Sequence, residues 1–139
     1  MYKQLGYSLA LLFLGGMTAY DIRWKKIPAV WVAAVGIVAV IYFAMGKQCS
    51  IDTAVLCMLP GMVLLLLAAL TGEGIGYGDG MTALVIGFLI GGDFCAVMVC
   101  LAIMMTGIFS LYRILRKCRE PIPLIPFFLG AMEVMLAYA

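Results

Sequence analysis

Long apolar stretches with almost no charged residues dominate this sequence. Six of them fall at residues 5–21, 28–45, 51–70, 75–91, 94–112 and 122–138. Each is close to the roughly 20 apolar residues that an α-helix needs to cross a lipid bilayer. Of the 139 residues, 66% are hydrophobic and 12% are charged, and a soluble domain of this size cannot bury so much apolar surface. We therefore predict an all-α integral membrane protein with six transmembrane helices, in a single domain over residues 1–139.

The stretch from Gly80 to Tyr112 decides the number of spans. It contains one charged residue, Asp93, and at 1.5 Å per residue it is too long for a single crossing. The triplet Gly91-Gly92-Asp93 is typical of a tight turn between two antiparallel helices. The alternative is one long tilted helix, which would give five spans.

The basic residues favour six spans. Short cytoplasmic loops collect Lys and Arg. With six spans, seven basic residues fall on one side of the membrane and two on the other. The two are Lys3 and Lys47, and the seven are Arg23, Lys25, Lys26, Arg113, Arg116, Lys117 and Arg119. With five spans, the bases of the first loop, beginning at Arg23, and those of the last loop, beginning at Arg113, would fall on opposite sides of the membrane. We therefore expect a multi-pass protein of the cell membrane, with both termini outside and the first, third and fifth loops in the cytoplasm.

Other binding classes are disfavoured by composition. The basic residues form no stripe with interleaved aromatics, so we expect no nucleic-acid partner. The five cysteines form no CxxC pair and the chain has no histidine, so we expect no metal site.

Two of the few acidic residues are placed to meet. Asp21 ends the first predicted span, in Tyr20-Asp21-Ile22-Arg23, and Asp79 opens the fourth, in Gly76-Tyr77-Gly78-Asp79-Gly80. The topology inferred from the basic residues puts both at the cytoplasmic edge. Glycine lets another chain approach closely, so Gly76, Gly78 and Gly80 are candidates for binding an extended substrate strand.

Two neighbouring carboxylates suit peptide hydrolysis. They share a proton because both cannot easily ionise. The charged one can act as general base on water, and the protonated one can polarise a peptide carbonyl and protonate the leaving amine. The simpler alternative is structural: Asp21 could pair with Arg23 or Lys25, and Asp79 could cap its helix.

These residues resemble a known family, the type IV prepilin peptidases and archaeal preflagellin peptidases of the GxGD class. Asp21-Ile22-Arg23 followed by Lys25-Lys26-Ile27-Pro28 resembles the family's Asp-x-Arg…Ile-Pro segment. Gly76-Tyr77-Gly78-Asp79 matches GxGD, and Ile125-Pro126-Phe127-Phe128 is similar to the Pro-Phe that begins the last helix. Their order and the number of spans agree across nearly the whole chain.

The resemblance implies that Asp21 and Asp79 are the catalytic pair. It also implies cleavage of prepilin-like substrates, which carry a basic leader and a hydrophobic helix, on the cytoplasmic side just before that helix. No cofactor is expected. Two departures stand out: Met81 occupies a position where the family commonly has Lys, and the long loop with paired CxxC motifs is absent. We therefore expect peptidase activity without methyltransferase activity or S-adenosylmethionine.

Three other functions remain open at this stage. An intramembrane protease similar to presenilin or signal peptide peptidase would also pair a Tyr-Asp with GxGD. A small proton-coupled transporter subunit would use Asp79 and Glu133 as relays. An inactive scaffold of a pilus or secretion machine is the third. The Asp-x-Arg…Ile-Pro segment favours the prepilin peptidase.

Overall fold

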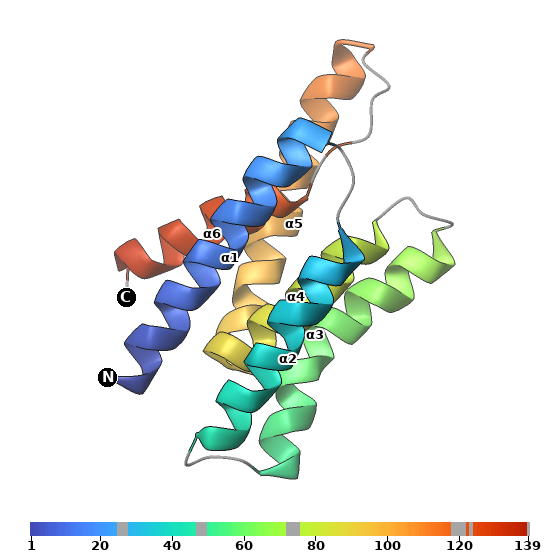
Figure 1. Cartoon of the computed structure of the whole chain (residues 1–139). Coiled ribbons are helices and arrows are strands. Elements are labelled where there is room, and N and C mark those ends of the chain that lie inside the picture. Colours follow the sequence, from blue (N-terminus) through green and yellow to red (C-terminus); the bar gives the residue numbers. More distant parts are fainter. Residues whose placement is uncertain (25–27, 47–49, 72–75, 118–121, 123, 139) are drawn as a thin grey trace.

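Over the residues that it describes, the computed structural model consists of six α-helices. It describes residues 1–139 except 25–27, 47–49, 72–75, 118–121, 123 and 139 (Figure 1). In chain order the helices are α1 (Tyr2–Trp24), α2 (Ala29–Met45), α3 (Ile51–Leu70), α4 (Tyr77–Ile90), α5 (Gly92–Leu115) and α6 (Ile125–Tyr138). Within the described residues all regular structure is helical, so the predicted all-α class is confirmed.

Three of the helices are long and apolar enough to cross a membrane. They cover Lys3–Trp24, Ile51–Leu70 and Gly92–Leu115. The other three are apolar but shorter; α4 and α6 have 14 residues each, which corresponds to about 21 Å against a hydrocarbon core of about 30 Å. These lengths agree with a membrane protein, and the expectation of six complete spans stays a prediction.

The chain reverses direction between α4 and α5. Gly91 has φ +97°, a left-handed conformation that residues with a side chain rarely adopt. It separates the two helices, and Figure 1 shows the chain turning back sharply at this point. Two helices therefore occupy the stretch that could have formed a single long one.

Glycines bring α3 and α4 close together. A Cβ atom added at Gly61 would meet Leu84, one at Gly80 would meet Leu65, and one at Gly87 would meet the backbone carbonyl of Cys57. These contacts follow an antiparallel register along the two helices. Small residues allow such approach in lipid, where dispersion contacts replace the hydrophobic effect between helices.

Helix α4 occupies the centre of the bundle. It packs on α1, α2, α3 and α5, and most of its residues are buried. The helices alternate in direction, so the C-terminal ends of α1, α3 and α5 lie toward the upper side of Figure 1, with the N-terminal ends of α2, α4 and α6. We call this the aspartate end, because it holds Asp21 and Asp79. Both chain termini point toward the opposite end.

Candidate active site

Asp21 continues the buried stripe of α1. Gly6, Ala10, Leu14 and Met17 are buried at intervals of three or four residues, which places them on one helix face, and Asp21 is the next position on that face. Its side chain is half-buried. The helix therefore directs this carboxylate toward the bundle interior, in the last turn before the helix ends at Trp24.

Asp79 lies in the first turn of α4 and is only 7% exposed. Gly76 is the N-cap residue in an extended conformation, and its carbonyl accepts a hydrogen bond of 3.0 Å from the Asp79 N–H. The Gly76 N–H in turn donates to the Asp79 carboxylate. The second of these bonds corresponds to the half of a capping box in which the side chain at N3 accepts from the N–H of the N-cap residue. The helix-capping role considered from the sequence is therefore present, and it ties the carboxylate to the N-cap residue.

Asp21 and Asp79 lie at the same end of the bundle, on α1 and α4. These helices pack on each other and run in opposite directions. The two carboxyl groups are near enough for their charges to interact. Arg23 is exposed and forms no ion pair with Asp21. The purely structural role considered for Asp21, an ion pair with Arg23, is therefore not supported. Lys25, the other proposed partner, lies outside the described residues.

The three candidate substrate-binding glycines have different surroundings. Gly76 is exposed, and an added Cβ there would lie 3.2 Å from Oδ2 of Asp79. The Gly78 carbonyl accepts a hydrogen bond of 2.7 Å from the Thr82 hydroxyl. Gly80 is buried against Leu65 of α3. A packing role accounts for Gly80, and substrate contact at all three glycines stays a prediction.

Thr82 belongs to this site, although the sequence analysis did not single it out. Its side chain is fully buried one turn after Asp79, and its hydroxyl ties the first turn of α4 at Gly78. Because Thr82 follows Asp79 by three residues, the sequence already indicated that these two side chains lie on one helix face. Thr82 therefore stabilises the turn that carries the carboxylate.

The remaining acidic residues lie away from the pair or outside the described residues. Asp52 and Asp93 are exposed in the first turns of α3 and α5, at the opposite end of the bundle. Glu133 is exposed on α6. Glu73 and Glu120 are not among the described residues. Within the described part of the chain, no group of three metal-binding side chains occurs.

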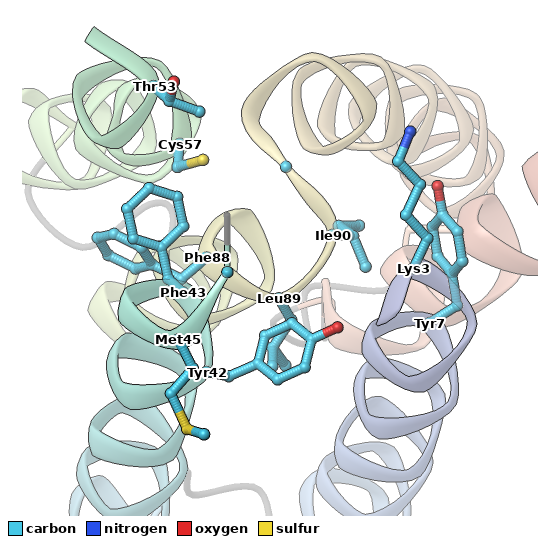
Figure 2. Close-up of a pocket in the computed structure, with 12 residues that line it drawn as sticks. Lys3, Tyr7, Tyr42, Phe43, Met45, Thr53, Cys57, Phe88, Leu89 and Ile90 are labelled. Atoms are coloured by element: carbon cyan, nitrogen blue, oxygen red, sulfur yellow. The ribbon is translucent and has the colours of Figure 1, made fainter. Parts of the chain in front are cut away.

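A cavity of about 590 Å³ opens at the opposite end of the bundle (Figure 2). Lys3 and Tyr7 of α1 lie on one side of it, and Thr53 and Cys57 of α3 lie on the other. Neither aspartate lines this cavity. This cavity is therefore not part of the site that holds Asp21 and Asp79.

A comparison with protein families decides which group this chain belongs to. Residues 8–111, which include both aspartates, match the type IV leader peptidase family. The chain belongs to that family. The resemblance found in the sequence is thereby confirmed, and the chain is a protease of the leader peptidase kind. Searches of curated proteins and of solved structures returned no match. The Pro-Phe segment at the start of α6 lies outside the matched residues.

Proposed function

We propose that this leader peptidase is a membrane aspartic endopeptidase that uses Asp21 and Asp79 as its catalytic pair. Its substrates are prepilin-like proteins with a basic leader and a hydrophobic helix, cut where the leader meets the helix. The observation that carries the proposal is that both carboxylates lie at one end of the bundle, on helices α1 and α4 that pack on each other, near enough for their charges to interact. Both lie within the residues that match the family.

The pair can hydrolyse a peptide bond without a metal or a nucleophilic side chain. One carboxylate, ionised, removes a proton from a water molecule, and the water oxygen attacks the peptide carbonyl carbon. The other carboxyl group, protonated, donates a hydrogen bond to the carbonyl oxygen as negative charge develops there. The tetrahedral intermediate then collapses, the C–N bond breaks, and the leaving amine takes a proton from the pair. The products are a new carboxyl group and a new amino group.

The position of the pair favours a bond at the membrane edge. Asp79 lies in the first turn of its helix and Asp21 in the last turn of its own. An intramembrane protease cuts a bond deeper within a membrane helix, whereas we expect these helix ends to lie near the membrane edge. The junction between a polar leader and an apolar helix lies at this depth.

The proposed topology has six spans, with the aspartate end in the cytoplasm and both termini outside. The described bases at the aspartate end support this orientation; they are Arg23, Arg113, Arg116 and Lys117. Lys3 lies at the other end. An excess of Lys and Arg marks the cytoplasmic side. The protein would then reside in the cell membrane, where prepilin leaders face the cytoplasm.

The catalytic roles are tested by replacing each carboxylate with its amide. Asp21→Asn and Asp79→Asn keep nearly the same volume, so the protein should insert and accumulate normally. Each should reduce cleavage of a co-expressed prepilin-like substrate by at least about 10²-fold, the lower limit typical of losing an acid–base group. Cleavage is read from the size shift of the substrate on a gel.

Two carboxylates elsewhere provide matched controls. Asp52 and Asp93 also lie in first helical turns, but at the opposite end and exposed. Asp52→Asn and Asp93→Asn should leave cleavage unchanged. Full cleavage by either Asp21→Asn or Asp79→Asn would refute the mechanism, because neither carboxylate can be dispensable in a working pair.

A further inference from the structure

Helices α1 and α2 follow each other in the chain, yet they are splayed apart. Each packs on α4, while the described residues of α1 and α2 make few contacts with one another. A groove of about 420 Å³ separates them. Consecutive antiparallel helices usually pack side by side, so this opening is a feature of the fold that its topology does not require.

The walls of this groove are suited to an apolar helix. All of its lining residues are apolar, aromatic or glycine, and they come from α1 and from α2 with Pro28; examples are Leu12 and Phe13 on one side and Val35 and Val38 on the other. Gly16 lines the groove, and a Cβ atom added there would meet nothing within 4 Å. An open glycine surface lets the backbone of another helix come close in lipid.

The groove extends along α1 toward the turn that carries Asp21. On α1 it extends from Leu9 to Tyr20 and includes Met17, which lies one turn before Asp21 on the same helix face, although neither aspartate lines the groove itself. Eleven steps of 1.5 Å give a length of about 16 Å, or three helical turns. A helix lying in the groove with its first residue at the aspartate end would place the preceding peptide bond at the last turn of α1, which carries Asp21. Continuity with the site distinguishes a substrate from a lipid chain or a second copy of the protein.

We infer that the groove between α1 and α2 binds the first turns of the substrate's hydrophobic helix and thereby sets which bond reaches the aspartates. This inference rests on the proposed peptidase function and adds the surface that recognises the apolar part of the substrate. The helix packs against Gly16 and the aromatic walls, with its N-terminus beside Tyr20. Leader residues then extend past the aspartate end into water.

Gly16→Leu fills the groove, and Gly107→Leu is its matched control. Gly107 is exposed on α5, where an added Cβ also meets nothing within 4 Å. With purified full-length enzyme and full-length prepilin-like substrate, Gly16→Leu should raise KM about tenfold and leave kcat within about twofold, a change equivalent to one lost apolar contact. Gly107→Leu should match the wild type. Equal KM values for the two variants would overturn the inference.

Photo-crosslinking tests the same surface without cleavage. A benzoylphenylalanine is placed at Leu12 in the groove or at Ile108 on α5, which are 75% and 71% exposed. The chain also carries Asp79→Asn, so that bound substrate stays intact. A substrate adduct at Leu12 and none at Ile108 supports the groove. Equal amounts of substrate adduct at the two positions would overturn the inference. Adducts of Leu12 that contain only lipid or a second copy of the protein would also overturn it. A wild-type enzyme that cleaves no prepilin would instead refute the proposed function itself.

Discussion

Replacing Gly80 with alanine tests how the packing of α3 against α4 positions Asp79. A Cβ atom at residue 80 would lie 2.8 Å from Cγ and Cδ2 of Leu65 and 3.1 Å from its backbone nitrogen. Ordinary contacts with carbon lie near 3.5–4.0 Å. The Leu65 side chain can rotate away, but its backbone cannot. The two helices must therefore separate by roughly 0.5 Å at the residue next to Asp79.

This separation should affect both stability and activity. Inserting a methyl group into a tight contact typically costs about 1–3 kcal/mol. A displacement of about 1 Å at a catalytic group can cost about 10²-fold in rate, so half of that should lower kcat/KM by about tenfold. Prepilin cleavage and thermal unfolding of the purified protein in detergent measure the two effects. Gly107→Ala, where the added methyl group meets open space, should change neither.

A second substitution separates packing from substrate contact at Gly80. Leu65→Ala removes the two side-chain atoms nearest to the new methyl group and leaves the backbone nitrogen at 3.1 Å. The double variant should therefore recover part of the activity lost in Gly80→Ala, a coupling expected between residues in contact. Full activity of Gly80→Ala would refute the packing argument. Lost activity without any recovery in the double variant would indicate a direct contact of Gly80 with substrate.

Two further predictions concern topology and substrate. Cys49 falls between α2 and α3, and Cys118 falls between α5 and α6; both lie outside the described residues. A membrane-impermeant thiol reagent added to intact cells should label Cys49 alone. Labelling of Cys118 would contradict the proposed orientation. Since glycines surround Asp79, we expect a small residue just before the scissile bond. Replacing that small residue of the substrate with tryptophan should block cleavage, which is read from the size of the substrate on a gel, and unchanged cleavage would refute a narrow site.

The sequence predicted the helices well because lipid imposes a length on each apolar stretch. The predicted stretch 51–70 coincides with α3, and the predicted turn at Gly91 separates α4 from α5. Asp21 and Asp79 were both placed at one end of the bundle, since the direction of each helix followed from the distribution of basic residues. For these features local pattern was sufficient.

The packing of the helices was not predictable in the same way. In a soluble helix the buried face is the apolar one, but here the lipid-facing residues are apolar as well, so periodicity does not mark the core. Leu12 and Leu14 look alike in sequence, yet the first is exposed and the second fully buried. The role of Gly80 against Leu65 and the gap between α1 and α2 depend on how helices cross, which no single stretch specifies.

Met81 replaces the lysine that is common in the family two residues after the GxGD aspartate, and its surroundings predict what restoring that lysine would do. Positions i and i+2 of a helix do not face each other. Asp79 is buried, whereas Met81 is 47% exposed. A cation at this position would therefore lie on the outer surface of α4 and would not pair with the carboxylates across the site.

Met81→Lys should accordingly leave catalysis intact and alter substrate binding only modestly. An exposed charge pair contributes about 0.2–1 kcal/mol, and the new cation would repel a basic leader, so KM should rise by no more than about fivefold while kcat stays constant. Added salt should remove the difference, because exposed charges are screened within about 10 Å at 0.1 M ionic strength. Steady-state cleavage at low and high salt measures both parameters. A large change in kcat that persists in high salt would show that residue 81 acts on the aspartates directly, and the outward orientation of its side chain would then be wrong.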